Sequence, residues 1–153
     1  MDIETHHGDR LVLQHLFALA DDSETQIASY IALGEVLVAC DGDGIIGHLQ
    51  ILEAGEAGAY ELKSMAVDLS RQREGIGCSL VAAAVTLCRS RHGRRLIVST
   101  AAADIGNLRF YQRQGFRMYR VVQDAFRPDT GYPDGIMIDG IALRDQVFLE
   151  LTL

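Results

Sequence analysis

The sequence predicts one mixed α/β (α+β) domain that spans residues 1–153. Three observations support this fold class. The N-terminal part carries apolar side chains at helical spacing, β-rich runs joined by glycine-containing turns follow, and the second half alternates strand-like with helix-like segments. Of the 153 residues, 48% are hydrophobic, which is enough to bury one core.

Two short helices are expected near the N-terminus. Residues 11–20 and residues 26–33 each place apolar side chains on one helical face. The sequence Asp-Asp-Ser-Glu at residues 21–24 separates them and is typical of a helix start.

An antiparallel meander is expected next. Residues 35–40 and 45–52 are β-rich, and the intervening Asp41, Gly42, Asp43 and Gly44 have the composition of a hairpin turn. After a connection that contains glycines, residues 60–67 form the next predicted strand.

The second half predicts a strand-helix alternation. Residues 75–92 carry an apolar stripe, basic residues in the last turn and a terminating glycine, so a long helix is expected. Residues 96–100 form an apolar run typical of a strand covered on both faces. A second helix is expected at residues 105–114, and two final strands at 116–122 and 142–153 are linked by a long polar loop.

Composition excludes several protein classes. No stretch approaches the roughly 18 to 20 apolar residues of a membrane span, and the N-terminus does not resemble a signal peptide, so a cytoplasmic protein is expected. Cys40, Cys78 and Cys88 form no Cys-x-x-Cys pair and are expected to be reduced. The five histidines show no metal-ligand spacing, so no metal site is predicted.

The charges are divided along the chain. Net charge is −7, yet residues 63–120 carry eleven basic against three acidic residues, whereas both flanking segments are acidic. This division indicates that the central segment binds an anion and that the two flanking segments attract a cation. Alternatively, the charges only form solvated surfaces. The overall acidity, without interleaved basic and aromatic residues, disfavours nucleic acid as a partner.

A predicted anion site lies where the strand at residues 60–67 leads into the long helix. Free N–H groups at a helix N-terminus bind anions, and Gly75 and Gly77 let a phosphate approach while Arg71 and Arg73 add donors. The pattern is neither Gly-x-Gly-x-x-Gly nor a P-loop, which disfavours a dinucleotide or a nucleoside triphosphate. In the alternative interpretation, the glycines only allow close helix packing.

Two segments together resemble the GNAT acetyltransferase superfamily. The family's acetyl-CoA motif is Gln/Arg-x-x-Gly-x-Gly/Ala, and residues 72–77 read Gln-Arg-Glu-Gly-Ile-Gly. A second family motif, a helix with an aromatic-Tyr pair followed by Gly-Phe, is matched by residues 107–116. The expected element order matches this family over nearly the whole chain. The resemblance implies a mixed, mostly antiparallel sheet of six to seven strands flanked by about four helices.

The resemblance also implies acetyl-CoA as co-substrate and assigns roles to residues. Tyr111 matches the tyrosine that protonates the departing CoA thiolate, a reasonable transfer between groups of pKa near 10 and 8.5. Glu61 is the candidate base, through a raised pKa or through water; alternatively it is only a polar residue on a strand face. Many members carry an asparagine seven residues before the tyrosine, where this chain has Asp104. The asparagine of this chain, Asn107, lies four residues before Tyr111, so its assignment to the cofactor is weaker than that of Tyr111. The predicted cofactor-binding residues are Met65, Ala66, Val67, Arg71, Gln72, Arg73, Glu74, Gly75, Ile76, Gly77, Cys78, Asn107 and Tyr111.

The acceptor is expected at the acidic ends of the chain. In GNAT enzymes it usually binds between the first helices and the last hairpin. The predicted substrate-binding residues are Asp21, Asp22, Glu24, Asp124, Phe126, Tyr132, Asp134 and Asp139. Their charge favours a small cationic amine, with an aminoglycoside-type antibiotic ranked above a polyamine or a peptide or protein amine. A non-catalytic acyl-CoA-binding sensor is the alternative of a different class, and homodimers are common in the family.

Overall fold

The computed structural model describes residues 1–42 and 44–153. Asp43, in the turn expected at residues 41–44, lies outside the described residues. The elements follow one another in the order β1 (Asp2–Thr5), η1 (Arg10–Leu13), α1 (Gln14–Ala20), α2 (Glu24–Tyr30), β2 (Glu35–Asp41), β3 (Gly44–Glu53), β4 (Ala59–Val67), η2 (Leu69–Arg71), α3 (Ile76–Ser90), β5 (Arg95–Ala101), α4 (Ile105–Arg113), β6 (Arg117–Val122), η3 (Pro128–Thr130), β7 (Met137–Ile138), β8 (Ile141–Ala142) and β9 (Gln146–Thr152).

Seven strands form one mixed sheet in the order β1-β2-β3-β4-β5-β9-β6. The pairing is antiparallel except between β4 and β5, which are parallel. The short strands β7 and β8 pair separately as a hairpin. The predicted mixed, mostly antiparallel sheet with flanking helices is confirmed.

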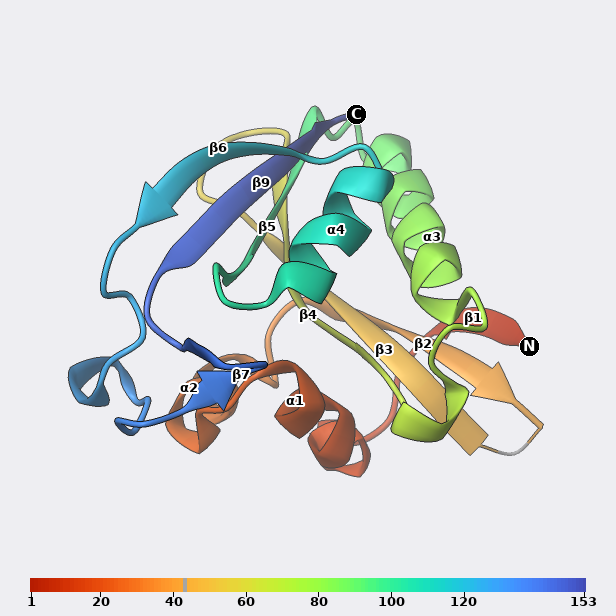
Figure 1. Ribbon diagram of the computed structural model, residues 1–153. Helices are drawn as coiled ribbons and strands as arrows, with labels where there is room; N and C mark the ends of the chain where they lie inside the picture. Colours follow the sequence, from red (N-terminus) through yellow and green to blue (C-terminus); the bar gives the residue numbers. More distant parts are fainter. Residues whose placement is uncertain (43) are drawn as a thin grey trace.

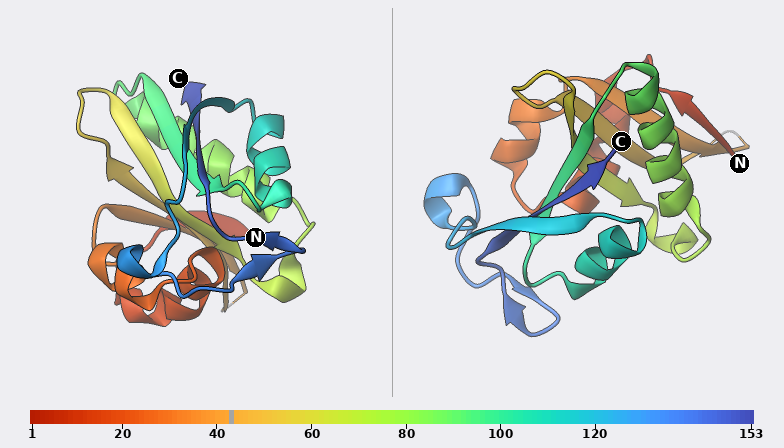
Figure 2. Two further views of the ribbon diagram at one scale, coloured as in Figure 1. Left: turned by 60° about the vertical axis from the view of Figure 1, so that its left-hand side comes forward. Right: turned by 90° about the horizontal axis from the view of Figure 1, so that it is seen from above.

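Helices cover both faces of this sheet (Figures 1 and 2). The larger core lies under α3 and α4 and includes Leu80, Ala84 and Tyr111 with strand residues such as Leu49 and Leu96. A smaller core lies under α1 and α2 on the other face. Among the described residues, no helix is both long and apolar enough to cross a membrane.

Two of the strands in the large sheet differ from the sequence prediction. β1 was not expected, because its four residues carry two acidic side chains and its pairing with β2 is a long-range contact. The last strand begins at Gln146 rather than Ala142, which instead belongs to the β7–β8 hairpin. The intervening Arg144 and Asp145 bond to Asp124 across the loop, so they are not part of the strand.

The divergence of β4 from β5 positions the functional site. The two strands pair only through residues 59–62 and 95–98. Beyond this point β4 continues beside β3 alone and β5 beside β9 alone. A register shift opposite Gln50 and Ile51 leaves Lys63 as an extra residue, a β-bulge where the split begins. The sheet therefore opens into a cleft toward the C-terminal ends of β4 and β5.

Candidate active site

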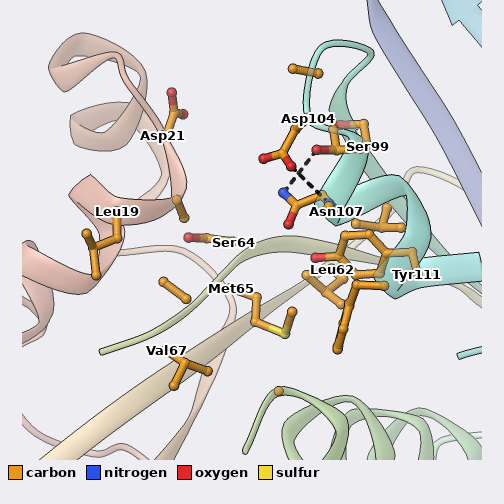
Figure 3. Close-up of a pocket in the computed structure, with 18 of the residues that line it drawn as sticks. Leu19, Asp21, Leu62, Ser64, Met65, Val67, Ser99, Asp104, Asn107 and Tyr111 are labelled. Atoms are coloured by element: carbon orange, nitrogen blue, oxygen red, sulfur yellow. Dashed lines mark hydrogen bonds between the residues drawn. The ribbon is translucent and has the colours of Figure 1, made fainter. Parts of the chain in front are cut away.

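One cavity of about 890 Å³ occupies this cleft (Figure 3). Its wall is formed by the α1–α2 turn, the free half of β4, the loop into α3, the C-terminal half of β5, α4 and the loop before β9. Segments from the acidic ends and the basic centre of the chain thus meet around one space.

The N-terminus of α3 opens onto the cavity without a side-chain cap. Gly75 is the N-cap residue, and the first amide that bonds back into the helix is that of Ser79, to the Gly75 carbonyl at 3.1 Å. The amides of Ile76, Gly77 and Cys78 precede it in the first turn, where N–H groups lack helical partners. All three residues line the cavity. Together with the positive end of the helix dipole, they form an anion site of the kind that holds a phosphate.

Glycine is required at two positions of this loop for two different structural reasons. Gly75 has a φ of 83°, a left-handed conformation that favours glycine, and a Cβ there would meet nothing within 4 Å. A Cβ on Gly77 would lie 3.3 Å from the Phe110 ring of α4. Gly75 therefore permits the turn, whereas Gly77 permits close packing of two helices, as the alternative interpretation of the sequence held.

The basic residues around this anion site, from the loop and from the end of α4, also divide into two groups. Arg71 bonds to Asp41 at 2.8 Å and to Glu74 at 3.0 Å, and these two carboxylates raise its pKa. Arg73 and Arg113 line the cavity, and no carboxylate of the described residues forms a salt bridge with either. Arg71 therefore fixes the loop, and Arg73 and Arg113 are available to an anionic ligand.

The free edge of β4 presents backbone groups to the cavity. The Asp68 amide donates to the Ile46 carbonyl of β3 at 2.8 Å, and bonding to β3 alternates along an antiparallel strand. Ala66 consequently pairs with β3, whereas the backbone groups of Met65 and Val67 face the cleft. The Gln72 side chain donates to the Val67 carbonyl at 3.2 Å and ties the loop to the end of the strand.

Tyr111 lies at the centre of the cavity wall. Its side chain is 5% exposed and packs edge-on against Phe110 and Phe116, while its hydroxyl is directed into the cavity (Figure 3). Burial, and to a lesser degree the charge of Asp104, raises the pKa of Tyr111 above its usual value of 10.0. The phenol is therefore fully protonated at neutral pH and can donate its proton.

Asp104 and Asn107 both line the cavity, with different roles. The Asp104 carboxylate accepts from the Asn107 amide at 2.9 Å and caps α4. The Asn107 side chain donates to Thr100 Oγ1 at 3.2 Å, which leaves its carbonyl oxygen toward the cavity (Figure 3). The Asn107 carbonyl oxygen is thus available to a ligand.

The opposite wall carries acidic and aromatic side chains. Asp21 accepts hydrogen bonds from the hydroxyls of Tyr30 at 2.7 Å and Tyr132 at 2.8 Å. The Phe126 ring packs edge-on against Tyr132 at 4.9 Å. Asp22 lines the cavity beside them, and burial together with the nearby Asp21 raises its pKa. The Asp22 carboxylate has no hydrogen bond or ion pair with the other described residues.

Six residues predicted at the site do not line the cavity. Glu61 lies where β4 still pairs with β5, opposite Ile97, so the neighbouring strand separates it from the cleft. Asp124 is paired with Arg144 at 3.0 Å, and Glu74 holds Arg71. The remaining three are exposed in the first turn of α2 or in the loop before β9, and they are Glu24, Asp134 and Asp139.

The structure adds residues that the sequence analysis missed. Tyr30 belongs to the apolar stripe of α2, and its hydroxyl reaches the cavity only because Asp21 lies beside it. Lys63 and Ser64 line the wall at the bulge of β4. Ser64 bonds to Nε2 of the fully buried His48 at 2.8 Å, and burial lowers the pKa of His48 to about 3. No local sequence signal distinguishes these residues from ordinary strand and helix positions.

Within the described part of the chain, no group of three or more His, Cys, Asp or Glu side chains is arranged to hold a metal ion. The wall instead offers free amides, guanidinium groups, an open strand edge and a phenol, with carboxylates on the opposite side. This arrangement suits a long ligand that ends in phosphates and carries an extended, strand-like arm.

Known proteins that resemble this chain were compared with it, by family and by structure. A family model described as "Acetyltransferase (GNAT) domain" matches residues 32–118. The "Uncharacterized N-acetyltransferase YvbK" of Bacillus subtilis (strain 168) is 31% identical over 141 residues, which cover 92% of this chain and 89% of that protein.

Two solved structures are similar over almost their whole length. The IAA acetyltransferase from Bacillus cereus ATCC 14579 has 31% identity and a TM-score of 0.88, with 99% of this chain and 100% of that chain covered. A GNAT family acetyltransferase from Elizabethkingia anophelis with acetyl-CoA bound has 28% identity and a TM-score of 0.90, with 99% and 97% covered. Acetyl-CoA is thus the co-substrate, as expected. The chain belongs to the GNAT superfamily and is an acetyl-CoA-dependent N-acetyltransferase.

Proposed function

We propose that the enzyme acetylates a primary amine of a small cationic acceptor, and that an aminoglycoside-type amine is the first class to test. The acidic and aromatic wall of Asp21, Asp22, Phe126 and Tyr132 carries this proposal, because it faces the same cavity as the uncapped α3 N-terminus. Asp21 is occupied by two phenols, so the Asp22 carboxylate is the group left for an ammonium ion.

The size of the cavity limits what can enter. About 890 Å³ must hold the arm of acetyl-CoA and the reacting end of the acceptor together. A polyamine, or one amine-bearing ring of an aminoglycoside, meets this limit. A peptide or protein amine would have to enter as an extended N-terminus or a single side chain, and it stays in the acceptor panel for that reason.

The reaction needs a proton acceptor for the incoming amine. An unperturbed alkylammonium has a pKa near 10.4, so removing its proton at pH 7 costs roughly 4 to 5 kcal/mol. We assign this role to Asp22 rather than to Glu61, because Asp22 lines the cavity, and its raised pKa makes it a stronger base than an ordinary aspartate. Asp22 is exposed, so the proton can pass on to solvent.

The residues on the opposite side of the cavity carry out the remaining steps. Amides of the α3 N-terminus and the cations Arg73 and Arg113 hold the pyrophosphate, and the open edge at Met65 and Val67 pairs with the pantetheine arm. The neutral amine attacks the thioester carbonyl and forms the N–C bond, the nitrogen loses its second proton to solvent, and the carbon–sulfur bond breaks. Tyr111 donates a proton to the departing sulfur and regains one from water. Because the pKa of Tyr111 is raised, full proton transfer is less favourable, and its expected contribution lies near the lower end of the usual 10²- to 10⁴-fold.

An acceptor screen tests the proposal. Purified enzyme and acetyl-CoA are incubated with aminoglycosides, polyamines, N-terminal peptides and neutral amines, and CoA release is followed with a free-thiol reagent. Cationic amines should be preferred, their KM should rise with ionic strength, and Asp22→Asn should remove this salt dependence. Equal turnover of neutral amines, or a KM that salt does not change, would contradict the electrostatic basis of the proposal.

A further inference from the structure

Lysine occurs once in this chain. Of its fourteen Lys and Arg residues, thirteen are arginine and the remaining one is Lys63. A guanidinium group remains protonated and does not accept an acetyl group from a thioester under these conditions, whereas a lysine amine can. Lys63 therefore carries the only side-chain amine of the protein that acetyl-CoA could acetylate.

This single lysine lies in the wall of the acetyl-CoA cavity. It is the extra residue of the β4 bulge, two positions before Met65, whose backbone faces the cleft. A strand rises about 3.3 Å per residue, so the backbone of Lys63 is within roughly 7 Å of the edge where the pantetheine arm is expected. The four-carbon stem of lysine is flexible enough to bring its amine to that edge.

The Lys63 side chain is also free to move. Its Nζ lies 4.8 Å from the centre of the Tyr30 ring, and it forms no salt bridge or hydrogen bond with the described residues. A cation–π contact at an exposed site contributes about 0.5 to 1 kcal/mol, so it holds the amine only weakly. Lys63 thus lies in the wall of the same cavity as Asp22, where an external ammonium group is expected.

We propose that Lys63 is an internal acceptor and that the enzyme acetylates its own Nζ. After the ammonium group loses a proton to water, the nitrogen lone pair attacks the thioester carbonyl of acetyl-CoA. The N–C bond forms, the nitrogen loses its second proton to solvent, and the C–S bond breaks with its electron pair on sulfur. Tyr111 protonates that sulfur and regains its proton from water, so the products are acetyl-Lys63, CoA thiol and one released proton.

The modification would change the acceptor wall. Acetylation removes the positive charge that lies over the Tyr30 ring, whose hydroxyl donates to Asp21. The inference rests on acetyl-CoA binding and the acetyltransferase activity of the family, and it does not depend on the identity of the external acceptor.

Mass spectrometry provides the test. The folded protein is incubated with acetyl-CoA and no acceptor, and the intact mass and tryptic peptides are followed over time. We expect one acetyl group per chain, loss of the tryptic cut after Lys63, and a rate constant that does not change with protein concentration. Because the reaction uses the folded site, labelling of Lys63 should be about 100-fold or more faster than in protein unfolded with urea.

Several controls separate this reaction from chemical acetylation. Lys63→Arg keeps the positive charge and removes the reactive amine, so no acetyl group should appear at position 63, and only the background labelling of the Met1 amine and of thiols should remain. Tyr111→Phe should slow the labelling of Lys63, whereas labelling of the Met1 amine, which precedes strand β1 and does not line the cavity, should be unchanged. Hydroxylamine removes an acetyl group from a thiol such as Cys78 and leaves an acetyl-lysine intact.

Three results would overturn the inference. These are an unlabelled Lys63 in protein that binds acetyl-CoA by calorimetry, equal labelling of folded and unfolded chains, or a rate that increases with protein concentration. Failure of acetyl-CoA to bind would instead contradict the assigned co-substrate site. The two kinds of failure are thereby distinguished.

Discussion

Gly131 provides a specific test of how the acceptor wall is built. It follows η3 in the loop before β9, has a φ of 97°, and lies against the N-terminus of α2. A Cβ at this position would be 2.5 Å from Ser23 Oγ and 2.8 Å from Thr25 Oγ1. The Ser23 hydroxyl is buried and caps α2 by accepting from the Gln26 amide at 3.2 Å, so it cannot move without losing that cap. We therefore predict that Gly131→Ala separates this loop from α2.

The expected magnitude follows from the contacts involved. A left-handed alanine costs about 1 to 2 kcal/mol, and loss of the α2 cap costs about 1 kcal/mol. Separation also breaks the bond from Gln26 to the Thr130 carbonyl at 3.0 Å and the bond from Tyr132 to Asp21 at 2.8 Å. Each contributes about 1 to 2 kcal/mol. Because these terms are not fully additive, we expect the total loss of stability to lie near the lower end of their sum, at about 4 kcal/mol.

Gly135→Ala is the matched control. Gly135 lies in the same loop with a φ of 85°, yet a Cβ there would meet nothing within 4 Å. It should show only the left-handed penalty of about 1 to 2 kcal/mol.

The assay compares the KM of the best acceptor with the affinity for acetyl-CoA in both variants. Gly131→Ala should raise the acceptor KM by about tenfold or more, since 1.4 kcal/mol corresponds to tenfold, while acetyl-CoA binding measured by calorimetry stays within about twofold. If Gly131→Ala and Gly135→Ala had the same acceptor KM and the same melting temperature, the docked loop could not be what forms the acceptor wall.

Three further predictions concern the site and the buried core. Tyr111→Phe should lower kcat about 100-fold with little change in either KM, because it removes a proton donor and keeps the packing against Phe110 and Phe116; an unchanged kcat in steady-state assays would exclude Tyr111 as the acid. Asp22→Asn should lower kcat/KM by at least about tenfold, whereas Glu61→Gln should stay within about twofold, since only Asp22 lines the cavity; the reverse order would restore Glu61 as the base. For His48, burial lowers the pKa from 6.5 to about 3, so the unfolded chain binds a proton that the folded chain does not, and stability present above pH 6.5 is lost as the pH falls toward 3. Urea unfolding should show a loss of about 2 kcal/mol between pH 7 and pH 5 that is absent in His48→Asn, and equal slopes for the two proteins would contradict this assignment.

The sequence by itself determined the elements whose signals are local. Helices α3 and α4, the glycine turn that starts α3 and the position of Tyr111 follow from apolar periodicity, terminating glycines and short motifs, which depend on neighbours only a few residues away. The same is true of the helix start at residues 21–24, where the structure has Ser23 as the cap of α2. These features were sufficient to indicate a co-substrate with phosphate groups and the family to which the chain belongs.

The tertiary structure alone decided which charged residues face the ligand. The guanidinium of Arg71, which lines the cavity, is paired with Asp41, thirty positions earlier, and Glu61 lies where β5 pairs with that half of β4. Asp21 and Tyr132 meet although 111 residues separate them. Such pairings depend on how the sheet diverges and how loops dock onto it, and long-range contacts of this kind leave no periodic signal in the sequence. For that reason the sequence identified the co-substrate loop, whereas only the fold brought Lys63, Asp22 and Tyr30 into one cavity with it.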